Sequence, residues 1–351
     1  MTRDELMSLV AEGEVVQDGD CGGLDLSGAD LSGGLFERMN FRGAKLRGAR
    51  LDESTFSHCD FSGADLTGAR MHLANMLDGT LQGAKFVNGY LATSNILRCD
   101  LTEADFTGAT MVLAKLIECK LARADFSGVD LDRGAILKSS LPGARFAGAR
   151  LKQTALIEAD LSQSLLGGAI CSNTIFVKSR MAGLKLQGMF LQVTQFKGAD
   201  LSGVDFSGAD LTQCNFKDAN LSGAFLKDCK AGNAIFPNAN LSNAFLAGAQ
   251  LQQAIFIEAD VSGANFSRCN LYQAQFPKAV ARGAIFESAD LTYCDFSHVD
   301  LSSADLSNTQ VFRANFHRIK EEKSKWTGAN RESSLGTDAE RAEAEDWPRV
   351  A

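Results

Sequence analysis

The residues that most often do chemistry are sparse in this chain, and no spacing among them predicts an active site. The histidines, His58, His72, His298 and His317, are scattered over most of the sequence. No combination of serine, histidine and aspartate predicts a nucleophile with its base. Short Gly-x-x-Gly spacings are abundant, but an internal repeat generates them, so they do not predict a phosphate loop. We therefore expect no catalytic residue, no cofactor and no enzymatic activity.

Two further groups of residues could in principle bind metal, but neither predicts a metal site. The nine cysteines include no pair at the short spacing of a zinc site. Asp290, Asp295, Asp300 and Asp305 should form an acidic patch near the C-terminal end. We interpret these carboxylates as solvated turn residues rather than as cation ligands, because each stands directly before an apolar residue of the repeat.

A strict five-residue period positions the side chains of this chain. From Leu26 to Phe316 every fifth residue is apolar, and only Cys171, Ala231 and Ala281 are not Leu, Phe, Met, Ile or Val. This period fits neither an α-helix nor a flat strand, and it indicates a chain that turns a corner every five residues. Phenylalanine also recurs every twenty residues, which indicates that four corners close one coil; these residues are Phe176, Phe196, Phe216, Phe236, Phe256, Phe276, Phe296 and Phe316.

The residues around each central apolar position follow one pattern. Clean copies are Ala29-Asp30-Leu31-Ser32-Gly33 and Ala64-Asp65-Leu66-Thr67-Gly68. This pattern resembles the pentapeptide-repeat family, and the resemblance covers residues 21–316. It implies an all-β fold, a right-handed quadrilateral β-helix solenoid of about fifteen coils, with four pentapeptides per coil. The residue types agree, since large and small inward groups alternate and glycine after the centre suits turns with positive φ.

The cysteines fit this inward pattern. Cys21 and Cys171 lie at central positions, and the other cysteines precede a centre by two residues. We expect all of them to be small buried hydrophobic groups. Cys99 and Cys119 should stack one coil apart, which makes a disulfide conceivable, but a cytoplasmic protein would keep them reduced.

The chain should divide into three parts: residues 1–20, the repeat region 21–316, and a polar tail 317–351. Thr2 and Glu5 have the spacing of a capping box, so we predict a short helix over residues 2–12 that covers the first coil. The tail carries Trp326 and Trp347, and residues 338–345 could form a second short helix. Two interpretations of the tail remain open: Trp326 packs on the last coil, or the tail is a peptide that binds a partner.

The outward positions predict an interaction surface. The residue after each centre should face water, yet six successive coils place aliphatic groups there, and we call this set the aliphatic stripe: Leu77, Leu97, Ile117, Leu137, Ile157 and Val177. Ile175 flanks the stripe. A second, sparser outward apolar set consists of Phe225, Phe245 and Ile285, with Leu165 earlier in the chain. Contiguous exposed apolar surface often marks an interface, with a partner or with a second copy. Alternatively, a tail covers the stripe or the stripe only strengthens stacking. Between Leu165 and Phe190 the repeat loosens, and we expect a local distortion or a change of cross-section there.

Charge and hydropathy limit the class of partner. The net charge is −8. Residues 1–20 carry one basic and six acidic groups, and residues 317–351 carry seven basic and eight acidic groups. The net charge of the repeat region is therefore near −2. We expect no strong binding to nucleic acid, since no basic face stands out. No apolar run of about eighteen residues predicts a membrane span, and the first residues do not have the pattern of a signal peptide, so we expect a cytoplasmic protein.

These observations favour a protein-binding scaffold or adaptor. The opening Thr2-Arg3-Asp4-Glu5-Leu6, Gly13 and the run from Gly23 to Gly33 also resemble pentapeptide-repeat proteins associated with bacterial type VI secretion. That resemblance implies an accessory protein or chaperone that helps to load an effector or spike component. The alternatives are a DNA mimic that binds DNA gyrase, as some members of the family do, or a purely structural or secreted rod. Mimicry requires a strongly negative surface, which this repeat region lacks.

Overall fold

The structure is a computed structural model that describes residues 1–347. The chain forms two compact units, Met1–Leu184 and a second unit that begins at Lys185. Each unit is built from coils of one turn every twenty residues, and each is considered by itself.

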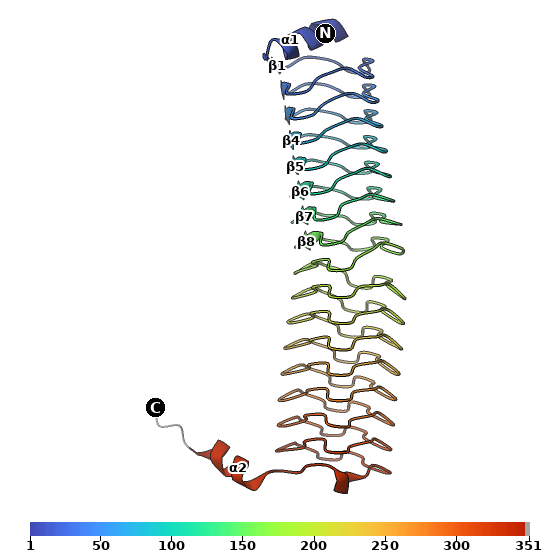
Figure 1. Ribbon diagram of the computed structural model, residues 1–351, viewed down its shortest axis with the longest axis vertical. Helices are drawn as coiled ribbons and strands as arrows, with labels where there is room; N and C mark the ends of the chain where they lie inside the picture. Colours follow the sequence, from blue (N-terminus) through green and yellow to red (C-terminus); the bar gives the residue numbers. More distant parts are fainter. Residues whose placement is uncertain (348–351) are drawn as a thin grey trace. The chain divides into compact units, whose positions relative to one another are not determined.

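One side of the first unit is a parallel sheet of eight short strands. The strands follow one another in sequence order, and each pairs with the next at a register of twenty residues, as Leu77 with Leu97 (Figure 1). Their bounds are β1 Val15–Gln17, β2 Leu35–Glu37, β3 Thr55–Ser57, β4 Asn75–Leu77, β5 Asn95–Leu97, β6 Lys115–Ile117, β7 Ala135–Leu137 and β8 Ala155–Ile157.

The other three sides of each coil are held by isolated parallel bridges. Asp20 pairs with Asn40, Asp25 with Lys45 and Asp30 with Arg50, and the same series continues through the unit. Three bridged sides and one strand side give a four-sided coil. The predicted solenoid of stacked four-sided coils is therefore confirmed.

Two kinds of backbone hydrogen bond define each corner. The Leu26 N–H donates to the carbonyl of Lys45 on the next coil at 2.7 Å, and the Ala29 N–H donates back to Leu26 at 3.0 Å to close the turn. The residue two places after the centre takes a left-handed conformation, with φ of 65° at Gly28 but also 51° at Arg98. Because glycine adopts this conformation most readily, its frequency at that position has a steric cause.

The polar residue before each centre shapes the following turn. The carboxylate of Asp290 accepts a hydrogen bond from the Thr292 N–H at 3.0 Å, and Asp295 accepts one from Ser297 at 2.9 Å. Asp300 also pairs with Arg282 at 2.7 Å. The acidic patch predicted near the C-terminal end therefore consists of turn-forming carboxylates.

Inward side chains fill each unit with columns of one residue type. In the first unit the rings of Phe86, Phe106, Phe126 and Phe146 stack at 4.8 to 5.0 Å between centroids. In the second unit the predicted phenylalanine ladder runs from Phe196 to Phe316, with centroids 4.6 to 5.4 Å apart. The small residues two before each centre are buried as well. The inward and outward assignments made from the sequence are confirmed for these columns.

The local geometry changes where the repeat pattern loosens. β8 is the last strand, and on the next coil Ile175, twenty residues after Ala155, makes only an isolated bridge to Ala155. Leu165 and Ile170 of the same coil hold the outward position that is usually polar, and both are exposed. The change lies within the segment in which the sequence predicted one.

The N-terminal helix α1, Arg3–Ala11, has the predicted capping box. Thr2 accepts from the Glu5 N–H, and the Glu5 carboxylate accepts from the Thr2 N–H at 2.7 Å. Leu6 is fully buried. The helix thus covers the first coil through Leu6 and contacts the strand β1. This strand lies before residue 21 and already pairs with β2. The repeats therefore begin earlier than the predicted bound, because the first side of the first coil is already formed by Val15–Gln17.

The second unit ends in a short turn and a helix. Lys320 and Lys325 still bridge to Asp300 and Asp305, so the coils also continue past residue 316. They are followed by the 3-10 turn η1, Arg331–Ser333, and by the helix α2, Ala339–Asp346, which Asp338 caps. A helix over 338–345 was predicted and is confirmed. The last four residues of the predicted tail lie outside the described residues. No helix in residues 1–347 is long and apolar enough to cross a membrane.

The stacked rings predict that inward phenylalanines contribute much more to the free energy of unfolding than outward ones. Phe236 is fully buried between Phe216 and Phe256. We expect Phe236→Ala to lower the free energy of unfolding by about 3–5 kcal/mol, because truncation leaves a cavity in the ladder. Phe225 is 41% exposed although it also stacks on a neighbour, Phe245, so Phe225→Ala should cost less than about 1 kcal/mol. Urea unfolding followed by circular dichroism measures both changes, and equal losses would contradict the assignment.

Candidate functional site

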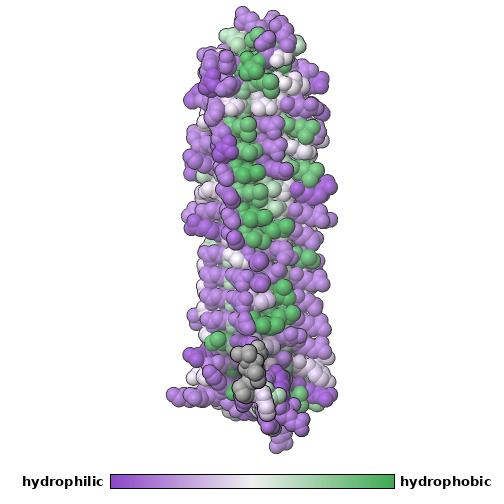
Figure 2. Space-filling model, turned by 90° about the vertical axis from the view of Figure 1, so that its left-hand side faces the viewer, coloured by the Kyte–Doolittle hydropathy of each residue, from purple (hydrophilic) through white to green (hydrophobic). Residues whose placement is uncertain are grey.

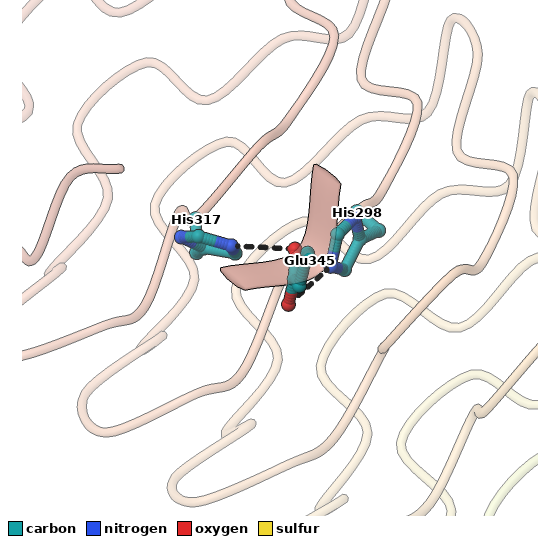
Figure 3. A group of neighbouring side chains, drawn as sticks. All are labelled: His298, His317 and Glu345. Atoms are coloured by element: carbon teal, nitrogen blue, oxygen red, sulfur yellow. Dashed lines mark hydrogen bonds and ion pairs between the residues drawn. The ribbon is translucent and has the colours of Figure 1, made fainter. Parts of the chain in front are cut away.

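The residues with the clearest chemistry gather at the end of the second unit. His298 and His317 stand on successive coils, and α2 brings Glu345 between them (Figure 3). Nε2 of His298 lies 3.2 Å from Oε2 of Glu345, and Nε2 of His317 lies 3.1 Å from the same oxygen. His317 is 1% exposed. We call His298, His317 and Glu345 the histidine–carboxylate cluster.

The hydrogen-bond partners assign the tautomer of His317. The Asp338 N–H donates to Nδ1 of His317 at 3.2 Å, so Nδ1 carries a lone pair. The proton of the neutral ring is then on Nε2, which donates to Glu345. The backbone of Asp338, which caps α2, thus orients the ring of His317, and this ring binds Glu345 near the other end of the helix.

Two histidines and a carboxylate are a donor set that zinc uses, so the cluster must be tested as a metal site. A metal at Nε2 of His317 would need the lone pair there and a proton on Nδ1. That proton would face the Asp338 N–H, which is itself a donor. The Glu345 carboxylate also has arginine partners, with Arg341 Nε at 2.9 Å and Arg318 Nε at 3.6 Å. The arrangement therefore fits a hydrogen-bonded ion cluster better than a metal centre.

The cluster changes the acidity of its carboxyl group. The hydrogen bond from His317 is the largest influence, and with those from Arg341 and His298 it lowers the pKa of Glu345 to about 2, although desolvation acts in the opposite direction. The docked form of α2 is therefore coupled to the ionised form of Glu345.

Arg318 adds a second polar attachment for α2. Its Nη2 donates to the Ala342 carbonyl at 2.7 Å and pairs with Asp346, and its backbone N–H donates to Thr337 Oγ1 at 3.1 Å. Within the described residues α2 has no buried side chain. Polar contacts, rather than apolar burial, hold this helix on the coils.

The prediction that all four histidines are scattered is wrong for His298 and His317. His298 and His317 follow their central phenylalanines, Phe296 and Phe316, by two and one residues, and their rings lie 5.3 Å apart. Their separation of about one coil in sequence was a signal that could have placed them together. Glu345 had no such signal, because the path of the tail does not follow the repeat.

The aliphatic stripe lies on the sheet of the first unit. Leu77, Leu97, Ile117, Leu137 and Ile157 are the last residues of β4 to β8 and are paired in register. Each is half-buried, as are Val177 and Ile175. Figure 2 shows hydrophobic surface running along this face. The outward placement predicted from the sequence agrees with this geometry.

A charged column borders the stripe. Arg98 pairs with Asp78 at 2.7 Å, and Lys178 pairs with Glu158 at 3.7 Å. These pairs join successive coils, so the charged edge contributes to stacking and keeps the apolar surface narrow.

The remaining candidate residues differ in exposure. Phe225 and Phe245 stack at 5.0 Å and are 41% and 47% exposed. Trp326 lies edge-on to Phe316 at 5.2 Å, and Arg331 stacks 4.2 Å from its ring. Trp347, directly after α2, is 71% exposed. Trp326 therefore packs on the last coil, which is one of the two interpretations left open by the sequence. Trp347 is accessible to solvent.

The cysteines are buried, as the inward pattern predicted. Burial raises the pKa of Cys99 to about 11 and that of Cys119 to about 12, so the reactive thiolate is disfavoured. The structure shows no disulfide between these two residues, which lie on successive coils.

The fold and the surface sites together define a parallel β-solenoid with side chains presented outward from a regular frame. Comparison with family models gives the same class: pentapeptide repeat models match residues 36–89, 94–133, 144–183, 154–192 and 194–230, and a pentapeptide repeat region model matches 229–306. The chain belongs to the pentapeptide repeat family. No curated protein matches it.

Several solved structures are similar in part. A trypsin-treated form of QnrB1, a plasmid-mediated fluoroquinolone resistance protein, is 22% identical with a TM-score of 0.41, over 47% of this chain and 82% of its own. HetL from the cyanobacterium Nostoc, involved in heterocyst differentiation regulation, is 17% identical over 96% and 98%, with a TM-score of 0.19. A pentapeptide repeat protein of the Arabidopsis thaliana thylakoid lumen is 36% identical over 30% and 69%, with a TM-score of 0.20. These scores carry no argument about function.

The histidine–carboxylate cluster predicts that acid releases α2. Because its partners lower the pKa of Glu345 from 4.5 to about 2 in the folded state, they stabilise docking above pH 4.5, and this contribution is lost as the pH falls towards 2. Fluorescence anisotropy of Trp347, in a Trp326→Phe background, should therefore fall over that range.

Two variants make this test specific. Glu345→Gln should remove the transition and leave Trp347 mobile at neutral pH, whereas Glu343→Gln, on the exposed surface of the same helix, should keep it. An unchanged transition in Glu345→Gln would show that another group controls the release.

Proposed function

We propose that this protein is a non-enzymatic scaffold that binds a protein partner through the aliphatic stripe. The observation that carries the proposal is the composition of one column of the sheet in the first unit. The last residues of β1, β2 and β3 are Gln17, Glu37 and Ser57, whereas those of β4 to β8 are all aliphatic.

This contrast argues that the aliphatic residues are not required for stacking. β1 to β3 pair in the same parallel register with polar residues at the same positions. The fold therefore accepts polar side chains in this column, and five successive aliphatic ones reflect another requirement. A contiguous apolar strip on an otherwise polar surface is typical of a site for a protein partner.

We further propose that the partner is a component of a bacterial type VI secretion system, an effector or a spike protein. Support for this narrower proposal comes from the acidic opening of the chain, in which α1 carries Asp4 and Glu5 in its first turn. A second copy of the chain is the alternative occupant of the stripe.

Mimicry of DNA has less support from the charges. Outward arginines pair with the acids of neighbouring coils, as Arg47 with Asp65 at 2.6 Å and Arg145 with Asp125 at 2.8 Å. A continuous negative surface of the kind that DNA presents is interrupted by these cations.

The stripe is tested by a triple substitution, Leu97→Glu, Ile117→Glu and Leu137→Glu. We expect wild-type circular dichroism, since the column accepts polar groups, and loss of the partner that the wild-type protein captures from native cytoplasm. The captured protein, once purified, should bind the variant about tenfold or more weakly by calorimetry. The control is Gln17→Glu with Ser57→Glu, which together with the native Glu37 gives three carboxylates in the same column outside the stripe.

Three outcomes would count against the proposal. Equal binding by the triple variant removes the stripe as the site, and loss of the β-signal makes the column structural. A wild-type dimer in sedimentation that becomes a monomer in the variant would identify a second copy as the occupant.

A supercoiling assay with purified DNA gyrase separates a scaffold from a DNA mimic. We expect no change in supercoiling with micromolar protein, because paired arginines break up the negative surface. Inhibition, or protection of gyrase from a quinolone, would favour the mimic.

A further inference from the structure

The helix α2 is held in place by a small set of basic and hydrogen-bonding side chains of the last coils. His298, His317 and Arg318 all belong to the coils rather than to the tail. Their partners in α2 are the carboxylates of Glu345 and Asp346 and the carbonyl of Ala342. Every one of these contacts joins a donor of the coils to an oxygen of the helix.

These three partner groups lie on one surface of the helix. Ala342, Glu345 and Asp346 are three and four residues apart, a spacing that places them side by side. Two of the three groups are ionised carboxylates, so the coils bind a helical acidic surface. The helix contributes no buried apolar side chain to this contact.

We propose that His298, His317 and Arg318 form a binding site for acidic helical peptides, and that α2 of the same chain occupies this site as a tethered, displaceable ligand. The site belongs to the second unit and the aliphatic stripe to the first, so this proposal does not rest on the scaffold function proposed for the stripe.

The donors are oriented for a carboxylate. The Nδ1 of His317 is engaged by the Asp338 N–H, so its Nε2–H points to Glu345. Arg318 is 28% exposed at its side chain and reaches both Asp346 and the Ala342 carbonyl. Hydrogen bonds to an ionised carboxylate are stronger than those between neutral groups, which explains how eight residues without apolar burial stay docked.

The same bonding makes the docking reversible. An ion pair of partly exposed side chains, such as that of Arg318 with Asp346, is weakened by salt and by competing carboxylates, whereas apolar burial is not. Asp346 is 70% exposed at its side chain, so a competitor can reach it. The tether gives α2 a high effective concentration, and a free peptide competes well only when the carboxylates of α2 are neutralised.

The test therefore uses the full chain with Glu345→Gln and Asp346→Asn, which we call the unlocked variant. The probe is a fluorescein-labelled synthetic peptide of residues 338–347, and binding is followed by fluorescence anisotropy at low salt. We expect the unlocked variant to bind the peptide about tenfold or more tightly than the wild-type chain. Binding should weaken strongly at about 0.5 M NaCl.

Matched variants test the site itself. In the unlocked background, Arg318→Gln and His317→Gln should each lower the affinity about tenfold. Of the two, Arg318→Gln carries less risk to folding, because the side chain of Arg318 is only half-buried whereas His317 is fully buried. The control is His58→Gln, since His58 follows its central phenylalanine by two residues as His298 does, but is in the first unit. It should leave binding unchanged.

Several results would overturn the proposal. They are equal peptide affinity of wild-type and unlocked chains, binding that survives Arg318→Gln, and equal binding of a control peptide that carries the Glu345→Gln and Asp346→Asn changes. Displacement of the peptide by inorganic phosphate at constant ionic strength would assign the site to simple anions. Tight binding of Zn²⁺ by the wild-type chain that is lost in Glu345→Gln would make the cluster a metal site.

Discussion

The backbone hydrogen bonds between successive coils are the constraint on which the rest of the structure depends. Central N–H groups donate to carbonyls nineteen residues later, as Leu26 does to Lys45, and the N–H before the centre donates to the coil before, as Lys45 does to Leu24. An inserted or deleted residue would shift every pair of that coil out of register and move inward side chains outward. This constraint explains why the five-residue period is unbroken from Leu26 to Phe316.

Because the backbone and the inward columns supply the stability, the outward positions are free to differ. The column that ends the strands carries Gln17, Glu37 and Ser57 on the first three and aliphatic groups on the next five. The left-handed turn position holds Gly28 in one coil and Arg98 in another. In a solenoid of this kind, the outward residues that depart from the repeat are therefore the candidates for a functional role, and the aliphatic stripe is such a departure.

Much of the fold was predictable, since each feature depends on neighbours in sequence or on residues one coil away. The capping box of Thr2 and Glu5, the phenylalanine ladder and the burial of the cysteines all follow from spacing. The bounds of the repeat region were less predictable, because Val15–Gln17 and Lys325 join the ladder without the full residue pattern. At the first end Val16 is buried at the central position, but its neighbours depart from the pattern. At the last end Trp326 takes the central position and lies edge-on to Phe316.

The sequence by itself determined the five-residue period, the four-sided coil and the side of the chain on which each repeat residue lies. Only the tertiary structure decided the histidine–carboxylate cluster. His298 and His317 are brought together by the stacking of two coils, but Glu345 reaches them through a tail that has no repeat, where η1 and the Asp338 cap direct the path of the chain. In a repeat, the position of each residue is set by its neighbours in sequence and by the coil before it. The position of α2 depends instead on hydrogen bonds between side chains far apart in sequence.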